Sequence, residues 1–430
     1  MSILDKTYHD ISKSLNGEVK IWCDEDNHKL FEYFSDFNEW LDGDEGQLIR
    51  IDNNLEGLSQ PSKAFYAGDP EAYNQVFKIF RQEQQERILS KTHISDTFGD
   101  EHWFDKNESR FEQLMECLEG KTVVPFIGAG LSVDGGFPAW NAHLRQQGKT
   151  SGINPDHVDD LINQGKYEEV IEEIEAKGFR DAFIQELKDV FSKTGKLTDT
   201  TWRISELFND TILTTNYDHL IEQAFETGGP DKLQVLDPTN ILEDPEINKT
   251  TIIKLHGDIK KPTQCILGKN QYDETYGNTD LDLKKPIPKI LSYHYKTSNL
   301  LFLGSSLYQD RTMQVFKAIK DEMNKAGDID RPAHFCLEAM PEEETELVER
   351  NAYLTNYGII PIWFPKGQYD FIEQILRLAK NEMRYRGHDL GKQMNIPNKE
   401  EQKQVNVIPS EIVVTEKESL WESVRNFFGI

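Results

Sequence analysis

Short apolar runs alternate with polar, helix-length stretches from residue 121 onward. Six runs are rich in β-branched residues and have the length of buried strands: 123–127, 211–215, 251–255, 299–303, 334–337 and 359–363. Runs of this kind are typical of a parallel sheet that is covered by helices on both faces. The pattern predicts an α/β fold, doubly wound around a mostly parallel, Rossmann-like sheet. Pro125 and Pro361 fall inside two runs, so each is expected to mark a strand start or an irregularity.

Helical spacing of apolar residues dominates before residue 121. Pro70 opens one stretch with apolar positions every third or fourth residue, and Gly120 is placed to end another. Between the first two strands, residues 153–196 are predicted to form a helical insert that packs as a lobe over the sheet.

Composition changes again near the C-terminal end of the chain. Residues 391–409 are polar and contain two prolines, which predicts a linker. An apolar helical stripe follows, formed by Leu420, Trp421, Val424, Phe427 and Phe428. We therefore expect an acidic, mainly helical N-terminal region at 1–112, an α/β domain at 113–390, and a linker with a C-terminal amphipathic helix at 391–430. That helix fits docking on its own domain, and equally contact with a partner or second subunit.

Net charge narrows the classes of ligand. The 430 residues include 48 basic and 75 acidic side chains, giving a net charge of −27. Residues 1–120 alone hold 26 acidic and 12 basic side chains. This balance argues against a direct grip on DNA or RNA and against binding to an anionic membrane surface.

Targeting and cysteine patterns favour the cytoplasm. No window approaches eighteen apolar residues, and residues 1–9 lack the basic and apolar regions of a secretory signal. The four cysteines form no Cys-x-x-Cys pair, which fits a reducing compartment and argues against a cysteine-clamped zinc site. They are Cys23, Cys117, Cys265 and Cys336. We expect a cytoplasmic protein with no metal and no membrane segment.

A glycine-containing turn follows the first predicted strand. It reads Gly128-Ala129-Gly130-Leu131-Ser132. Glycines at a strand-to-helix turn let the backbone approach a phosphate, and the following helix offers free N–H donors. The dehydrogenase fingerprint would need a third glycine where this chain has Val133. Taken alone, the turn is therefore a weak signal.

Polar or small residues also follow three further predicted strands. The second strand leads into Thr215-Asn216-Tyr217-Asp218, the third into His256-Gly257, and the fourth into Gly304-Ser305-Ser306. Open α/β sheets bind ligands at the carboxyl ends of their strands, so these groups are expected to share one crevice. Singly, Asn216 could cap the next helix and His256 could be a satisfied buried histidine.

The order of these motifs resembles that of sirtuins, the silent-information-regulator type of NAD-consuming enzymes. Gly-Ala-Gly-x-Ser, Thr-x-Asn-x-Asp, x-His-Gly and Gly-x-Ser-Leu follow one another as in that family. The chain is most similar to the bacterial sirtuin-like branch of antiphage defence, which carries Gly-x-Pro-x-Trp, here ending at Trp140, and Thr-Thr-Asn-Tyr-Asp. The resemblance covers roughly residues 113–380.

The resemblance implies a set of roles around NAD+. Asn216 would contact the nicotinamide ribose and position the attacking water, and His256 would act as the base toward a ribose hydroxyl. Asp218 would bind the nicotinamide carboxamide, with Thr215 beside it, and Trp140 would screen the reactive carbon. Binding of the diphosphate would fall to Gly128, Ala129, Gly130 and Ser132. The adenosine side would be lined by Gly304, Ser305 and Ser306.

Departures from the deacylase pattern favour water as the acceptor. The deacylase loop has an acid, an aromatic residue and an arginine where this chain has Ala139, Trp140 and Asn141, and the paired cysteines of its zinc ribbon are missing. The expected function is therefore an NAD+ hydrolase that depletes NAD+ in antiviral defence. Alternatives are an NAD- or ADP-ribose-binding regulatory subunit and, less favoured, a deacylase or ADP-ribosyltransferase.

Partners are implied by the resemblance alone. Defence sirtuins are activated through other proteins, so we expect a homo-oligomer with an activating partner. A HerA-type ATPase is favoured, with an Argonaute or another sensor as the alternative. The acidic N-terminal region and the C-terminal helix are the surfaces expected to meet it.

Overall fold

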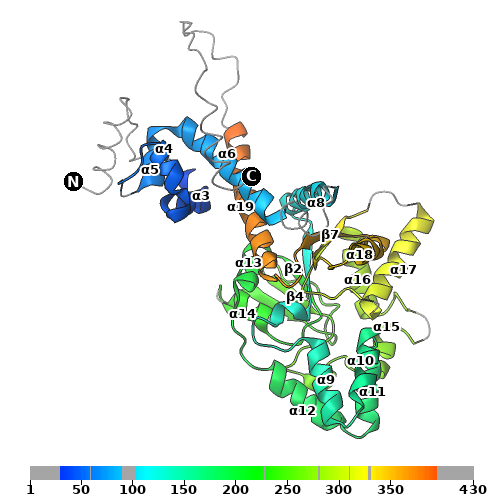
Figure 1. Cartoon of the computed structure of the whole chain (residues 1–430). Helices are drawn as coiled ribbons and strands as arrows, with labels where there is room; N and C mark the ends of the chain where they lie inside the picture. Colours follow the sequence, from blue (N-terminus) through cyan, green and yellow to red (C-terminus); the bar gives the residue numbers. More distant parts are fainter. Residues whose placement is uncertain are drawn as a thin grey trace, which may run out of the picture. The chain divides into compact units, whose positions relative to one another are not determined.

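The structure, a computed structural model, describes most of the chain between residues 30 and 394 (Figure 1). The described residues are 30–58, 60–89, 102–226, 228–278, 281–308, 310–327 and 331–394. The expected C-terminal amphipathic helix lies outside them. So does the expected linker, apart from its first residues, which belong to the helix that ends at Met394.

Seven parallel strands form the sheet at the centre of the fold. They are β1 (Val123–Ile127), β2 (Thr211–Thr214), β3 (Leu233–Leu236), β4 (Thr250–Lys254), β5 (Asn299–Leu303), β6 (His334–Ala339) and β7 (Ile359–Phe364). Their spatial order is β3-β4-β2-β1-β5-β6-β7, and every pairing is parallel. The chain runs outward from β1 in both directions, which is the doubly wound arrangement. The expected fold class is confirmed.

One strand, β3, was missed by the sequence pattern. It has four residues, lies at one edge of the sheet, and is mostly half-buried. Gln234 interrupts its apolar run and its side chain accepts a hydrogen bond from Thr251 at 3.1 Å. A short edge strand with a polar interior gives no continuous apolar signal.

Both prolines lie inside strands rather than at their starts. Pro361 is in β7, an edge strand, where a missing N–H leaves no interior ladder position empty. Pro125 pairs with Leu301 of β5, whereas the register of β1 with β2 begins only at Phe126. The proline therefore lies where β1 is paired on one side.

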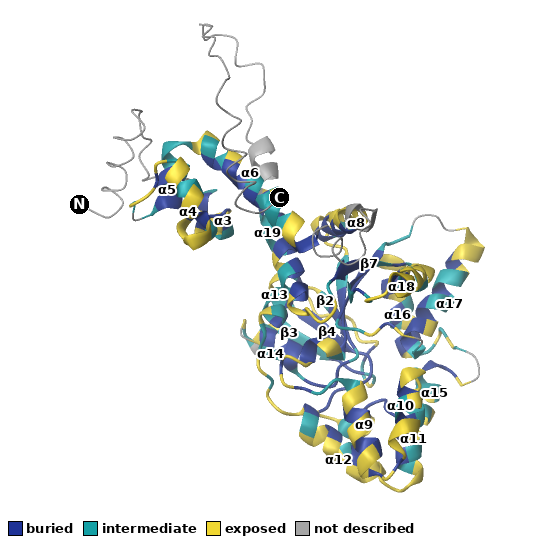
Figure 2. Cartoon of the chain, viewed as in Figure 1, coloured by how far each residue is buried: buried dark blue, intermediate teal, exposed yellow. Residues whose placement is uncertain are grey.

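Two groups of helices cover the two faces of the sheet (Figure 2). Neighbouring strand residues alternate between them: Phe126 packs on one face, with Phe302, and Ile127 on the other. The first face is covered by α16 (Pro286–Thr297), α17 (Arg311–Ala326) and α18 (Glu344–Asn356). The second is covered by α8 (His102–Glu119), α13 (Asp199–Leu207), α14 (Leu220–Glu226) and α19 (Asp370–Met394).

A helical lobe follows β1 and has an apolar core of its own. Its helices are α9 (Trp140–Thr150), α10 (Pro155–Asn163), α11 (Tyr167–Ala176) and α12 (Arg180–Phe191). Proline stands at the start of α10, and the Asn154 side chain caps that helix by accepting from the Asp156 amide. Leu144, Val170 and Phe183 are fully buried between these helices.

The N-terminal region forms a second helical group with an aromatic core. It comprises α3 (Ser35–Asp42), α4 (Gln47–Asp52), α5 (Pro61–Gly68) and α6 (Pro70–Leu89). Phe37 and Tyr73 are fully buried, and Tyr385 of α19 packs into the same cluster. The Arg81 guanidinium pairs with buried Glu382, also on α19.

The expected division of the chain at residues 112 and 390 stays a prediction, and α8 and α19 run across these two positions. Short 3₁₀ helices and one further α-helix complete the described elements: η1 (Asp44–Gly46), η2 (Ala129–Ser132), η3 (Pro230–Lys232), η4 (Pro262–Gln264) and α15 (Lys269–Tyr276). A search of the described residues finds no helix with the length and apolarity needed to cross a membrane.

Candidate functional site

A cavity of about 840 Å³ lies at the carboxyl ends of the central strands. Loops after β1, β2, β4 and β5 contribute to its wall, together with the last residues of β6. Eleven of the twelve residues singled out from the sequence line it: Gly128, Ala129, Gly130, Trp140, Thr215, Asn216, Asp218, His256, Gly304, Ser305 and Ser306. Its size falls within the range of small-molecule sites, so the strand ends do share one crevice as expected.

The glycine turn differs from the expected strand-to-helix turn. It continues into the 3₁₀ helix η2 of four residues, and the next α-helix begins only at Trp140. The Gly128 amide donates to Leu303 O at 2.9 Å, and the Gly130 amide donates to Gly304 O at 2.9 Å. These two donors are therefore used within the protein, and the expectation that the turn binds a phosphate stays a prediction. The Ala129 amide, on the cavity wall, takes part in neither bond.

The glycines themselves serve the packing of two loops. A Cβ on Gly128 would lie 2.6 Å from Gly304 O, and one on Gly130 would lie 2.7 Å from the same atom. Gly304 has φ of +63°, and its Cβ would lie 2.6 Å from the Leu131 amide nitrogen. Small residues are thus required because the loop after β1 and the loop after β5 interlock.

Ser132 is the one predicted residue that does not line the cavity. It is buried beneath the loop after β2, and its Oγ accepts a hydrogen bond from Asn216 Nδ2 at 3.1 Å. The structure thus gives this serine a contact with the predicted catalytic asparagine, and its predicted contact with the diphosphate is not supported by its position.

Asn216 is held in one orientation. Its Nδ2 also donates to Gly128 O at 3.1 Å, and because a carbonyl oxygen only accepts, this contact fixes which end of the amide is nitrogen. The opposite atom, Oδ1, is buried and has no hydrogen-bond partner within the described residues. A buried acceptor without a partner is unfavourable, so this oxygen suits a donor supplied by a ligand or a water. The side chain does not cap the next helix.

Asp218 lines the same end of the cavity and begins the turn into α14. Its Oδ1 accepts from the Leu220 amide at 3.0 Å. Burial raises the pKa of Asp218, and hydrogen bonds from Leu220 and Ser132, together with the Lys254 charge, oppose that rise.

His256 lies between two tyrosines of α15. Its Nε2 is 2.8 Å from the Tyr276 hydroxyl and its Nδ1 is 3.3 Å from the Tyr272 hydroxyl. Burial lowers the pKa of His256 to about 4, because a charged imidazole would lose its hydration there. The ring is therefore neutral at pH 7 and able to accept a proton. This shift depends on burial and could not be predicted from the local sequence.

Trp140 forms an aromatic wall beside the loop after β2. Its ring stacks on His143 at 5.6 Å and lies 5.4 Å from the Tyr217 ring. Phe191 of α12 closes the cluster behind it. The half-buried indole thus stands over the same end of the cavity as Asn216 and Asp218.

At the other end of the cavity, the loop after β5 meets the end of β6. Glu338, on β6, lines the cavity with 17% of its side chain exposed. Arg350 of α18 donates from Nε to Glu338 Oε1 at 3.0 Å, and also to Leu307 O and Ser306 O at 3.1 and 2.9 Å. Its guanidinium therefore fixes both the carboxylate and the loop. Burial raises the pKa of Glu338, and Arg350 opposes that rise.

Several cavity residues were missed by the sequence analysis. The connection between α10 and α11 and the first turn of α11 supply part of the wall, although the insert was expected to be only a packed lobe. These residues are Gln164, Gly165, Lys166, Tyr167 and Glu168. Arg311 of α17 ties this connection to the core by pairing with Glu168 at 3.2 Å and with Asp273 at 2.7 Å. Asp310, the cap of α17, also lines the cavity, and burial raises its pKa to about 6. A lone Asp before a helix predicts a cap, and nothing local predicts its place in a cavity.

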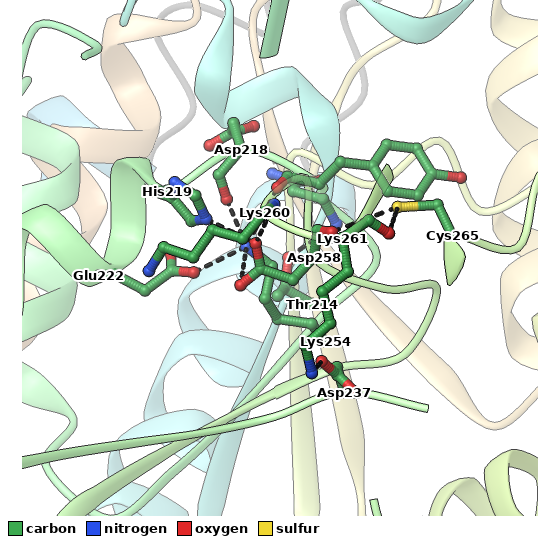
Figure 3. A network of polar contacts seen from close by, with 12 residues as sticks. Thr214, Asp218, His219, Glu222, Asp237, Lys254, Asp258, Lys260, Lys261 and Cys265 are labelled. Carbon is green, nitrogen blue, oxygen red and sulfur yellow. Dashed lines mark hydrogen bonds and ion pairs between the residues drawn. The ribbon is translucent and has the colours of Figure 1, made fainter. Parts of the chain in front are cut away.

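A polar network lies behind the loops after β2 and β4 (Figure 3). Lys254 Nζ is 2.7 Å from Glu222 and 3.9 Å from Asp258, and His219 Nε2 is 2.7 Å from Asp258. His219, Glu222 and Asp258 bring ligand atoms within 4.8 Å of one another, as a metal site would. The Lys254 ammonium competes for the same oxygen atoms, so we assign the positive charge of this cluster to the lysine. Burial alone would raise the pKa of Asp258, but His219 and Lys254 hold it well below its usual range.

Comparison with known families identifies the class of domain. Residues 210–362 match the model described as the SIR2-like domain. This range includes Asn216, His256 and the loop after β5, whereas the glycine turn precedes it. The expected resemblance is confirmed: residues 210–362 are similar to the SIR2-like domain.

Curated relatives are similar over part of their length. The NAD(+) hydrolase ThsA of Bacillus cereus is 26% identical over 238 residues, which are 54% of this chain and 46% of that protein. ThsA of Cytobacillus dafuensis is 25% identical over 276 residues, 64% of this chain and 51% of its own length. ThsA of Enterococcus faecium is 25% identical over 226 residues, 53% and 45% of the two chains. The chain thus spans about half the length of the curated relatives it matches.

Proposed function

We propose that this protein is an NAD+ hydrolase that cleaves the bond between nicotinamide and ribose. The observation that carries the proposal is the convergence of four strand-end loops on one 840 Å³ cavity, with both Asn216 and His256 on its wall. Similarity to proteins named NAD(+) hydrolase supports it.

The layout of the cavity suggests how the substrate would lie. The diphosphate would sit at the junction of the loops after β1 and β5, where the Ala129 amide lines the wall. Nicotinamide and its ribose would extend toward Asn216, Asp218 and His256. Adenosine would extend the opposite way, toward Ser306 and Glu338. Such an extended pose uses both ends of the crevice, as dinucleotides do in other doubly wound sheets.

The chemistry needs little acid catalysis, because nicotinamide leaves NAD+ as a neutral base. A water oxygen bonds to C1′ of the ribose while the C1′–N bond breaks, and nicotinamide takes the electron pair. Asn216 Oδ1 would accept a hydrogen bond from that water and hold it in line. Neutral His256 would accept the released proton by way of a ribose hydroxyl. ADP-ribose, nicotinamide and a proton are the products.

A second function is favoured by one observation. Both ring nitrogens of His256 already have tyrosine partners, which fits a site that binds NAD+ without turning it over. Purified protein should therefore be incubated with NAD+ and the products separated by chromatography. Loss of NAD+ with equimolar nicotinamide would support the hydrolase. Bound NAD+ without product over hours would support a regulatory subunit. A protein that neither consumes nor binds NAD+ would contradict both proposals.

We further propose that the activity serves antiviral defence, in the cytoplasm, by depleting NAD+. The chain would act as a homo-oligomer that an activating partner switches on, with a HerA-type ATPase favoured over an Argonaute or another sensor. The net charge of −27 supports a protein partner over direct contact with nucleic acid. Mass photometry of the protein alone and with a candidate ATPase would test assembly, and a monomer in both samples would contradict it.

A further inference from the structure

Lys254 is a fully buried lysine that belongs to none of the predicted site motifs. It is the last residue of β4, and its side chain is 0% exposed. Its ammonium donates to Tyr217 O at 3.2 Å, to Asp218 O at 2.6 Å and to Glu222 Oε1 at 2.7 Å (Figure 3). A lysine has three protons to donate, so these contacts use its whole capacity.

Two of the three contacts join the end of β4 to the loop after β2, and the third joins it to α14. Asn216 directly precedes Tyr217, and Asp218 is itself bonded through its carbonyl. His256 lies two residues after Lys254, beyond the end of the strand. The ammonium fixes the backbone at Tyr217 and Asp218, because it binds both of their carbonyl oxygens. The side chains of Asn216 and Asp218 line the cavity.

A purely structural ion pair would explain only one of these contacts. Lys254 and Glu222 alone would satisfy each other's charge, and such a pair can be replaced by apolar residues with little loss of stability. The two carbonyl contacts have no such replacement, because an apolar side chain cannot donate. Stability and loop position therefore depend on different contacts of one side chain.

We propose that Lys254 is a positioning residue, whose ammonium sets the place of Asn216 and Asp218 relative to His256 through the carbonyls of Tyr217 and Asp218. The catalytic part of this inference rests on the proposed hydrolase function. The placement of the loop does not, so the two can fail separately.

The test compares Lys254→Met with the double variant Lys254→Met/Glu222→Leu. The single variant leaves Glu222 buried without its cation, so its melting temperature should fall clearly. The second substitution removes that charge and should restore at least half of the loss. In the restored protein we expect kcat for nicotinamide release to stay about 100-fold below wild type, with KM changed less than about threefold, because misplaced groups slow the chemical step.

The control is Arg81→Met, which removes a partner of buried Glu382 far from the cavity loops. It should lower the melting temperature and leave kcat unchanged. Recovery of kcat together with stability in the double variant would overturn the proposal.

Hydrogen exchange provides a readout without turnover. Amides of residues 215–219 should exchange faster in the double variant than in wild type, at equal stability. Unchanged protection would overturn the placement of the loop, even if the wild-type protein proved inactive. If the double variant exchanges faster but the wild-type protein releases no nicotinamide, the role of Lys254 in placing the loop would stand. Only the proposed hydrolase function would then be contradicted.

Discussion

The two ends of the cavity are built in different ways. At the end of β2 and β4, the wall residues are held by partners buried behind them: Lys254 holds the loop, and Gly128 O and Ser132 orient Asn216. At the end of β5 and β6, a single arginine from α18 holds the loop and Glu338 from the side.

This difference separates two tasks. Groups that must meet a reacting atom need a fixed position, and buried contacts provide it. Groups that must distinguish one substrate from another need mainly the right charge and shape at the wall. The following predictions test that division.

The largest effect is expected at the β2 and β4 end. Asn216→Ala should lower the rate of nicotinamide release by about 1,000-fold, because it removes the oxygen proposed to hold the attacking water. Chromatography of the products measures the rate, and circular dichroism checks the fold. Asn356→Ala, at an exposed position on α18, is the matched control. Turnover at the wild-type rate would refute the role of Asn216.

The junction between the two ends should be the next most sensitive place. Gly304→Ala places a Cβ against the Leu131 amide in a left-handed backbone conformation. Gly367→Ala has a similar positive φ but nothing within 4 Å of the added Cβ. The first variant should therefore lose about 1–3 kcal/mol more of the unfolding free energy than the second. Urea denaturation measures both, and equal losses would show that the loops do not interlock.

The β5 and β6 end should control the choice of dinucleotide. Glu338 would accept hydrogen bonds from the adenosine ribose and repel a 2′-phosphate, so wild type should prefer NAD+ to NADP+. Glu338→Gln should reduce that preference about 10-fold, measured as the ratio of the two kcat/KM values. Glu346→Gln, exposed on α18, is the control. A loss of kcat with an unchanged ratio would mean that this end also takes part in the chemistry.

The smallest expected effect is on the pH dependence of stability, which compares buried histidines with an exposed one. Burial lowers the pKa of His143 and His294 to about 4 and of His334 to about 3, so the unfolded chain binds protons that the folded one excludes. The free energy of unfolding should therefore decrease as the pH is lowered, by about 0.7 kcal/mol for each histidine between pH 7 and pH 6. Denaturation of His143→Gln at both values should show a smaller drop than wild type, with exposed His157→Gln as control. An identical drop would indicate that His143 is accessible to protons in the folded state.

The sheet was predictable because its strands are apolar and continuous. Six of seven strands lie where the runs placed them, whereas β3, with Gln234 inside it, gave no such run. The strand ends then located the predicted site residues, since parallel strands finish at one edge. What local sequence could not show is contact across distance: Lys254 sits in an apolar run, yet its ammonium binds a loop that precedes it by some 36 residues.

The reason for the glycines was also hidden from the sequence. The motif was expected to admit a phosphate, and the structure shows loop against loop. Glu338 carried no signal because its role depends on β6 lying beside β5 and on Arg350 reaching across from α18.

The interlocked loops have a consequence for how such chains can change over evolutionary time. A side chain on Gly130 would meet the backbone of Gly304, and one on Gly304 would meet the backbone of Leu131 and Gly130. A larger residue at one position cannot be accommodated by adjusting its own loop, because the obstacle is the backbone of the other. Each turn, although far from the other in the sequence, therefore restricts the other to glycine for as long as the two loops keep this packing.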